Sequence, residues 1–474
     1  MDSTGSHSTE ADVVPRAAPL ATAWRDLAAV MSISFPVIMA MASHTLMGFV
    51  DTWLLAEYGR DEVASVGAAG SVVFVFIAFV FGTSNCTSAF VAQSLGRGSP
   101  GDCSRYAWQG VYFGLLAQVA LLPVIVLAGH IFAAFGHESQ IQAMETIYFR
   151  LRLLHAAGTA AYAALTSFFQ GVGKPVIPMY AALIANVFNA ILDAVLIFGL
   201  WGFPEMGITG AALATVIASY FQVALLFAWF FGGTMHEAFA TRTHWRPDLA
   251  RFAQLMRIGA PAGLSFMLHT ASWAIFTNIL IGRLGSDILA ANNITHAIIR
   301  LSFMPAIGVS KGVTVLVGQS IGRRNIPTAK RRAYAGMALA MLYMTLMGLL
   351  FVLFRGQIIR LFRNEPQIVE AGTRMLILAA VFQAFDALGI VSYGALRGAG
   401  DTRFPAIVDV ASGWLLLLPL GYALTFPLGL GYVGAWAAAA FQIAVVGAIF
   451  FLRFIGEAWR KIDIFATRKP PRTQ

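Results

Sequence analysis

Polar residues interrupt the apolar stretch at 186–199, which reads NVFNAILDAVLIFG. On a helix, Asn186, Asn189 and Asp193 stand three and seven positions apart and project from one face. A carboxylate inside a bilayer costs roughly 2.5–3.5 kcal/mol on insertion scales, and such residues are functional by default. We therefore favour a functional role for Asp193, whereas Asn186 could equally well form a hydrogen bond between helices.

The composition is that of a membrane protein. Of the 474 residues, 58% are hydrophobic and 12% are charged, whereas a soluble protein is about 25% charged. Apolar runs of about 18 residues or more, long enough to span ~30 Å of hydrocarbon, recur along the whole chain. We predict an all-α polytopic membrane protein with twelve transmembrane helices. They are expected at residues 27–56, 62–92, 107–133, 145–171, 175–200, 207–233, 257–284, 288–318, 333–357, 368–396, 404–426 and 431–455.

Basic residues are unevenly distributed between the two sides of this bundle. The terminal segments and the even-to-odd connections hold 22 of the 32 Lys and Arg residues. The positive-inside rule therefore places both termini in the cytoplasm, and the net charge of +9 reflects topology and not nucleic-acid binding. We expect a disordered cytoplasmic tail at 1–26, a cytoplasmic linker at 234–256 and a basic cytoplasmic tail at 456–474. Cys86 and Cys103 are not expected to form a disulfide or to bind a metal.

The two halves of the chain resemble each other. Residues 91–110, VAQSLGRGSPGDCSRYAWQG, align without a gap with residues 317–336, VGQSIGRRNIPTAKRRAYAG, and 8 of the 20 positions are identical. Each copy holds six predicted helices, so the lobes at 27–233 and 257–455 enter the membrane from the same side. Parallel repeats of this kind form two lobes side by side, and rocking of the lobes gives alternating access. The duplication favours a transporter over an enzyme or a receptor.

Several motifs together resemble the multidrug and toxic compound extrusion (MATE) family. They are FVDTWLLAEYG at 49–59, GVGKPVIPM at 171–179, the stretch at 186–199, GITGAALAT at 207–215 and, in the second half, LRGAGDTRFP, GWLLLLPLGY and GYVGAW. The resemblance covers about residues 27–455. It implies a two-lobed, twelve-helix antiporter that exports organic, often cationic compounds in exchange for protons or sodium ions.

Two carboxylates are predicted to lie in the outer half of the N-terminal lobe. Asp193 lies about 27 Å from Pro175 along its helix, at about 1.5 Å per residue, and Asp51 lies near the end of the first helix. A carboxylate shielded from water holds a proton more readily, and two carboxylates with neighbouring oxygens can instead hold a hard cation. The resemblance implies that Asp51, Asn189 and Asp193 form an ion-coupling site for H+ or Na+. Thr215 could complete it.

The C-terminal lobe departs from the family pattern. Asp386 matches a family aspartate that one branch pairs with a glutamate, but His269 occupies the position of that glutamate here. An imidazole titrates near neutral pH, so this difference favours proton handling over sodium binding. Lys311 and Arg300, three turns apart on one helix, could hold Asp386 ionised. Alternatively, Lys311 could extend to the cytoplasmic interface.

These features predict a secondary active antiporter of the plasma membrane that exports small organic, often cationic compounds by alternating access. Coupling to H+ is favoured over Na+, and no cofactor, enzymatic activity or nucleic-acid partner is expected. Two rival functions are a lipid-linked oligosaccharide flippase, against which the acidic pair argues, and a non-transporting membrane receptor or scaffold. We expect a monomer surrounded by membrane lipid. The sequence assigns no role to His296 or Asp409.

Overall fold

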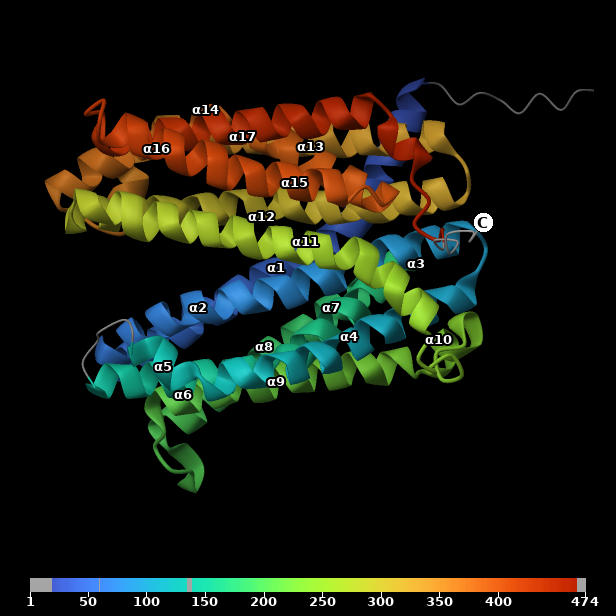
Figure 1. Cartoon of the computed structure of the whole chain (residues 1–474), viewed down its shortest axis with the longest axis horizontal. Coiled ribbons are helices and arrows are strands. Elements are labelled where there is room, and N and C mark those ends of the chain that lie inside the picture. The colour runs from blue at the N-terminus through green and yellow to red at the C-terminus, as the bar shows by residue number, and fades with distance from the viewer. Residues whose placement is uncertain (1–18, 59, 134–138, 467–474) are drawn as a thin grey trace, which may run out of the picture.

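The computed structural model describes residues 19–58, 60–133 and 139–466, and within these ranges it consists of helices and connecting loops without a β-strand. The N-terminal lobe contains α1 (Pro19–Tyr58), α2 (Arg60–Asn85), α3 (Thr87–Gly96), α4 (Pro100–Val126), α5 (Ala128–Ala133), α6 (Ser139–Leu153), α7 (Ala156–Gly171), α8 (Val176–Phe198), η1 (Leu200–Gly202) and α9 (Gly207–Phe230). After α10 (Gly233–Phe239), the C-terminal lobe contains α11 (Leu249–Ile275), η2 (Phe276–Ile281), η3 (Gly282–Leu284), α12 (Ser286–Gly322), α13 (Ile326–Arg360), α14 (Pro366–Ala399), α15 (Arg403–Ala411), η4 (Ser412–Leu417), α16 (Leu418–Thr425) and α17 (Gly431–Ile455), followed by η5 (Ala458–Lys461). The two lobes lie side by side (Figure 1).

The fourth membrane crossing is broken into two helices. Within the described residues, eleven helical segments are long and apolar enough to cross a membrane. The remaining predicted crossing corresponds to α6 and α7, which are separated by a break at Leu154 and His155. α6 is the less apolar of the two because it carries Glu145, Arg150 and Arg152. The prediction of twelve helices in two six-helix lobes is confirmed, with this break as an addition.

The first helix begins earlier than predicted. α1 starts at Pro19 and not at residue 27, so the expected disordered tail is wrong for its last part, while residues 1–18 lie outside the described chain. Proline is well tolerated at the first helical position, and the segment that follows is rich in Ala and Leu, which favour helix. Asp26 remains within the helix because Arg331 and Arg332 of α13 form ion pairs with it.

The connection between the lobes is also more ordered than predicted. The expected linker at 234–256 contains most of α10, and α11 already begins at Leu249. The Asp248 side chain accepts a hydrogen bond of 3.0 Å from the backbone N–H of Arg251 and so caps α11. Asn325 caps α13 in the same manner. Polar caps therefore extend these helices beyond the apolar runs from which their ends were predicted.

The chain that follows α17 packs against both lobes. Trp459 is 1% exposed and stacks on Phe454 of α17, with ring centroids 5.4 Å apart. Further along, the Phe465 ring lies edge-on to Tyr106 of α4, with ring centroids 5.9 Å apart. The start of the predicted basic tail at 456–474 thus connects the C-terminal lobe to the N-terminal lobe.

Small residues allow the lobes to approach closely. α1 packs against α12, and α2 packs against α11. A Cβ atom on Gly263 of α11 would lie 2.1 Å from the Thr83 hydroxyl, and one on Gly312 of α12 would lie 2.3 Å from the Ser34 hydroxyl. Glycines at such positions let helix backbones come together in a membrane.

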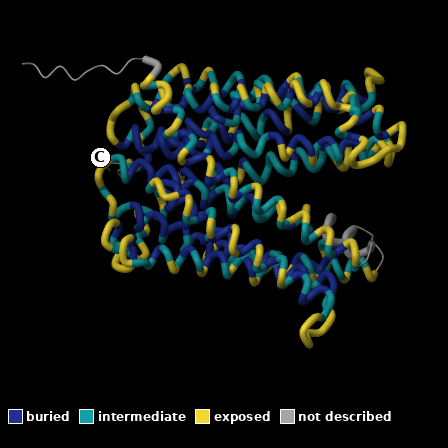
Figure 2. The backbone as a smooth tube through the Cα atoms, turned by 180° about the vertical axis from the view of Figure 1, so that it is seen from behind, coloured by how far each residue is buried: buried dark blue, intermediate teal, exposed yellow. Residues whose placement is uncertain are grey.

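The lobes are in contact at one end of the molecule and diverge toward the other. Figure 2 shows this arrangement, with buried residues concentrated at the end that carries the C-terminal segment. We call this the basic end, because the connections there carry six Lys and Arg residues, namely Arg97, Lys174, Arg242, Arg246, Arg323 and Arg324. These connections are residues 97–99, 172–175, 231–248, 323–325 and 400–402.

Candidate functional site

Asp51 of α1 and Asp193 of α8 place their carboxyl groups beside each other, and the Asn189 side chain lies beside Asp193. Asn189 and Asp193 have no solvent-exposed surface. One oxygen of Asp51, both oxygens of Asp193 and both amide atoms of Asn189 are buried without a hydrogen-bond partner among the described residues. Since buried polar atoms are normally hydrogen-bonded, this cluster has free capacity for a proton or a cation.

A positive charge lies near this carboxylate pair. Arg152, at the end of α6, interacts electrostatically with both Asp51 and Asp193. The Tyr220 hydroxyl donates a hydrogen bond of 3.1 Å to the carbonyl of Leu154, which supports the backbone where α6 ends. Arg152 lies two residues before the break between α6 and α7. Hydropathy does not reveal such a break, which is why sequence reasoning missed this residue.

The two other polar residues proposed near the pair make different contacts. Asn186 donates a hydrogen bond of 2.5 Å to the Ser43 hydroxyl and so joins α8 to α1. Thr215 donates its hydroxyl hydrogen to the carbonyl of Ala211 on its own helix, at 2.9 Å. Asn186 thus has a structural partner, and no hydrogen bond connects Thr215 to the carboxylates within the described chain.

The C-terminal lobe contains a cluster of histidine and tryptophan side chains in place of a second carboxylate pair. His269 Nε2 accepts a hydrogen bond of 3.1 Å from Trp273 Nε1. The His296 ring lies 5.5 Å from the Trp273 ring and 5.2 Å from the Trp436 ring, measured between centroids. Trp436 in turn donates a hydrogen bond of 3.1 Å to the Asn292 side chain. The neutral His269 ring must carry its proton on Nδ1, because Nε2 acts as the acceptor.

Asp386 and Asp409 take no part in this cluster within the described chain. No hydrogen bond or ion pair in the described chain joins Asp386 to His269, Arg300 or Lys311. The expected contacts of Asp386 with a histidine or a cation are therefore absent from this conformation. Asp409 of α15 instead faces Ser265 of α11.

Lys311 occupies a pocket between the lobes. It lies on α12, and its ammonium nitrogen is 5.7 Å from the centroid of the Phe81 ring on α2. The pocket is otherwise formed by α1, α2, α7 and α8 and the loop before α8, and it includes His44 and Tyr162. Lys311 therefore faces the N-terminal lobe, which differs both from the predicted position beside Asp386 and from extension to the membrane interface.

The repeated motif forms the contact between the lobes at the basic end. Gln93 donates a hydrogen bond of 2.9 Å to the carbonyl of Gly398 in the other lobe. Its repeat partner Gln319 donates one of the same length to the carbonyl of Gly171. The signal for these residues was present in the sequence as identical positions of the repeat, but their partners became visible only in the fold.

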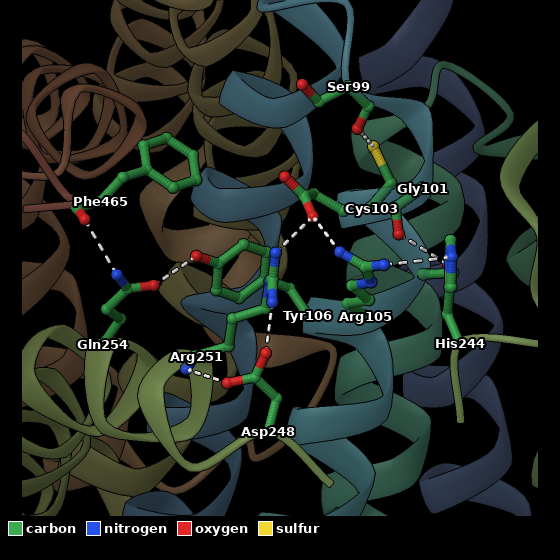
Figure 3. A network of polar contacts seen from close by, with 12 residues as sticks. Ser99, Gly101, Cys103, Arg105, Tyr106, His244, Asp248, Arg251, Gln254 and Phe465 are labelled. Atoms are coloured by element: carbon green, nitrogen blue, oxygen red, sulfur yellow. Dashed lines mark hydrogen bonds and ion pairs between the residues drawn. The ribbon is translucent and has the colours of Figure 1, made fainter. Parts of the chain in front are cut away.

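A polar network closes the basic end further, as Figure 3 shows. Arg251 of α11 forms ion pairs with Asp102 of α4, at 2.8 Å, and with Asp248. Gln254 of α11 accepts a hydrogen bond of 2.5 Å from Tyr106 of α4 and donates one of 2.9 Å to the Phe465 carbonyl. The network therefore ties the first turns of α11 to the N-terminal lobe.

Two titratable groups of this network lie outside the membrane-spanning helices. Burial lowers the pKa of His244 below its ordinary value, and the nearby Arg105 guanidinium lowers it further. Burial raises the pKa of Asp248, but the hydrogen bonds and the charge of Arg251 outweigh this effect and leave it below its ordinary value. At neutral pH, His244 is therefore neutral and Asp248 is ionised.

Two parallel six-helix lobes, a buried carboxylate pair and a pocket between the lobes define the class of the molecule as a membrane transporter. Comparison with solved structures supports the fold. The chain is similar to a transporter of the MOP superfamily from Pyrococcus furiosus, with a TM-score of 0.82, 20% sequence identity, and coverage of 92% of this chain and 97% of the other. It is similar to a eukaryotic MATE transporter with a TM-score of 0.82 and 19% identity, over 93% and 97% of the two chains.

Sequence comparison identifies the family. The MatE family model matches residues 36–195 and 261–423. A probable multidrug resistance protein NorM of Brucella suis is 31% identical over 449 residues, which cover 92% of this chain and 93% of that protein. A protein of the same name from Thermotoga maritima is 28% identical over 433 residues, covering 91% and 92% of the two chains. The chain belongs to the MATE family of multidrug efflux transporters.

Proposed function

We propose that this protein is a secondary active antiporter of the plasma membrane that exports organic compounds in exchange for protons. The observation that carries the proposal is the Asp51–Asp193 pair, whose buried oxygens have no hydrogen-bond partner in the described chain. Two carboxylates in a dry site repel each other when both are ionised, so protonation of one of them is favourable. Binding of an ion at such a site can shift an equilibrium between two conformations.

The arrangement of the lobes supports an alternating-access cycle. With both termini in the cytoplasm, the basic end is the inner end, and the conformation is closed inward and diverges outward. A proton taken up from outside by the pair lowers the affinity for the substrate, which leaves outward. The lobes then close outside, separate at the basic end and release the proton inside. Coupling requires only that proton binding changes the affinity for the substrate and that substrate binding changes the affinity for the proton by the same factor.

Coupling to H+ is favoured over Na+ by the C-terminal lobe. His269 occupies the position where part of the family has a glutamate, so this lobe offers one fewer oxygen ligand for a hard cation. Asp51, Asn189 and Asp193 retain enough oxygen atoms to hold Na+ in the N-terminal lobe, and sodium coupling is the alternative that the experiment must separate. The protein acts as a monomer surrounded by lipid.

Efflux of the fluorescent cation rhodamine 6G from proteoliposomes tests the proposal, with a pH gradient and a sodium gradient applied separately. We expect the pH gradient alone to drive efflux and Asp193→Asn to abolish the driven flux. Glu237→Gln, which neutralises an exposed carboxylate on α10, serves as the matched control and should transport normally. Full activity of the Asp193→Asn variant would contradict the proposed site, and stimulation by sodium alone would contradict proton coupling.

A further inference from the structure

A small pocket lies between the lobes, on the basic-end side of the carboxylate pair. Its volume is about 30 Å³, which is room for about two water molecules. His44, which lines it, is two helical turns before Asp51 on α1, so the pocket and the pair are distinct sites. Its polar lining consists of His44, Asn85, Tyr162, Thr166, Gln170 and Lys311.

The charge of this pocket is positive. Lys311 is the one charged side chain among the described residues that line it, and no carboxylate is among them. No ion pair of Lys311 occurs in the described chain, and its ammonium nitrogen lies 5.7 Å from the centroid of the Phe81 ring. A cation–π contact compensates for only part of the cost of removing an ammonium from water. Lys311 therefore lacks a counter-ion in this conformation.

The surroundings of Lys311 add positive and hydrogen-bonding groups. Arg397 of α14 interacts electrostatically with Lys311, and its Nε atom is buried without a hydrogen-bond partner in the described residues. On the other side of the pocket, the Tyr162 hydroxyl lies 3.3 Å from His44 Nε2. Hydroxyl, amide and ammonium groups can all donate to an oxyanion, and the ammonium adds charge to the bond. The lining thus matches an anionic oxygen group and repels a cation.

We propose that this pocket binds the carboxylate or sulfonate group of an amphipathic organic anion, with Lys311 as the counter-ion, and that such anions are transported substrates. This inference rests on the proposed transport function and adds organic anions to the cationic compounds expected as substrates. The pocket is large enough for the anionic group only, so the apolar part of the substrate extends toward the diverging side of the lobes. The same oxyanion chemistry also occurs in lipid headgroups, and the experiment separates the two sources.

The position of Lys311 connects binding to the conformational cycle. The ammonium comes from α12 in the C-terminal lobe, whereas the other lining residues come from the N-terminal lobe. Separation of the lobes at the basic end moves Lys311 away from Tyr162 and His44. The affinity for the anion therefore differs between the two conformations. A ligand can be coupled to a conformational change only if its affinity differs between the conformations.

Two xanthene dyes of similar size provide the test, because sulforhodamine B is anionic and rhodamine 6G is cationic. Binding is measured by fluorescence anisotropy with the purified full-length protein, and flux is measured in proteoliposomes. We expect Lys311→Met to raise the Kd for sulforhodamine B at least tenfold and to lower the ratio of anionic to cationic dye flux by a similar factor. Lys311→Arg should keep the Kd within about threefold, and Lys461→Met, which removes an exposed charge elsewhere, should not change it.

Several results would overturn the proposal. The first is an unchanged Kd for sulforhodamine B in Lys311→Met. The second is an equal decrease in the flux of both dyes in that variant. The third is that sulforhodamine B binds but is not transported, and that phosphatidylglycerol vesicles displace it. The last result would identify a lipid headgroup as the occupant. Lys311→Gln provides the same comparison if the methionine variant does not fold. The two proposals can fail separately. If rhodamine 6G flux requires Asp193, the antiporter proposal stands even when Lys311 proves unimportant for the anionic dye. If the wild type shows no gradient-driven flux of either dye, the antiporter proposal is refuted, and the binding measurement alone decides whether the pocket holds an anion.

Discussion

Replacement of Gly96 by alanine should open the basic end of the transporter. A Cβ atom on Gly96 would lie 2.2 Å from the carbonyl oxygen of Gln319 and 2.9 Å from the Cα of Gly322, both in the other lobe. These are backbone atoms of a helix, so the clash cannot be relieved by rotation of a side chain. When the lobes separate at this end, the same methyl group meets no obstacle. The substitution therefore penalises the conformation that is closed at the basic end.

The size of the shift follows from the cost of overpacking. Inserting a methyl group into a tightly packed contact costs about 1–3 kcal/mol. Because each 1.4 kcal/mol changes an equilibrium about tenfold, we expect the ratio of open to closed basic ends to rise about 5- to 150-fold. Gly322→Ala should act in the same direction, since its Cβ atom would lie 2.3 Å from the carbonyl oxygen of Gln93.

Distances between spin labels on the two lobes measure this equilibrium. Labels at Glu237 and Arg323, both exposed near the basic end, report its opening, and the native cysteines Cys86 and Cys103 are buried. Gly356→Ala is the matched control, because Gly356 also lies in a helix, α13, and a Cβ atom there would have no atom of another part of the described chain within 4 Å. An unchanged distance distribution in Gly96→Ala, with the protein folded, would refute the argument that backbone contact at this glycine holds the lobes together.

Three further predictions concern individual contacts. Gln93→Ala and Gln319→Ala should each weaken the closed basic end by about 1 kcal/mol through loss of one hydrogen bond, and clearly unequal shifts of the spin-label distances would contradict their symmetric roles. The pKa of His244 in the folded protein lies below its ordinary value of 6.5, so the unfolded chain takes up a proton on this histidine at a higher pH and the Tm falls as the pH drops below about 6.5. His244→Gln should remove this part of the decrease in Tm. Identical Tm profiles of the variant and the wild type from pH 5 to 8 would exclude this contribution. Asn186→Ala should lower the free energy of unfolding by about 1 kcal/mol by removing the bond to Ser43 and leave proton-driven efflux intact, and loss of coupling would assign Asn186 to the ion site instead.

Most of the fold could be predicted because it depends on local composition and on internal repetition. Apolar runs long enough to span the bilayer set the number and order of the helices, and the identical positions in 91–110 and 317–336 predicted two parallel lobes. The helix ends were less accurate, since polar caps such as Asp248 and the ion pair of Asp26 with Arg331 extend helices into polar sequence. These partners are distant in the chain, so local composition could not reveal them.

The candidate site shows the same division. The residue types and the shared helix face singled out Asn189 and Asp193, and depth along the helices placed Asp51 at a similar level. Contacts across helices were beyond this reasoning, which is why Lys311 was expected beside Asp386 and Arg152 was overlooked. A helix face predicted from periodicity says which way a side chain points but not which helix it meets.

The sequence by itself determined that this is a membrane protein with an internal duplication, two lobes and an aspartate within a membrane-spanning helix. Hydrophobicity, periodicity and repetition are properties of the chain alone. Only the tertiary structure decided that Asp51 meets Asp193, that Lys311 faces a pocket of the opposite lobe, and that Gln93 and Gln319 join the two repeats. The physical reason is that the hydropathy of the chain does not depend on how each lobe is rotated about its own axis, so the sequence pattern does not determine this rotation. It is fixed by close contacts between glycines and by hydrogen bonds whose partners lie far apart in the chain.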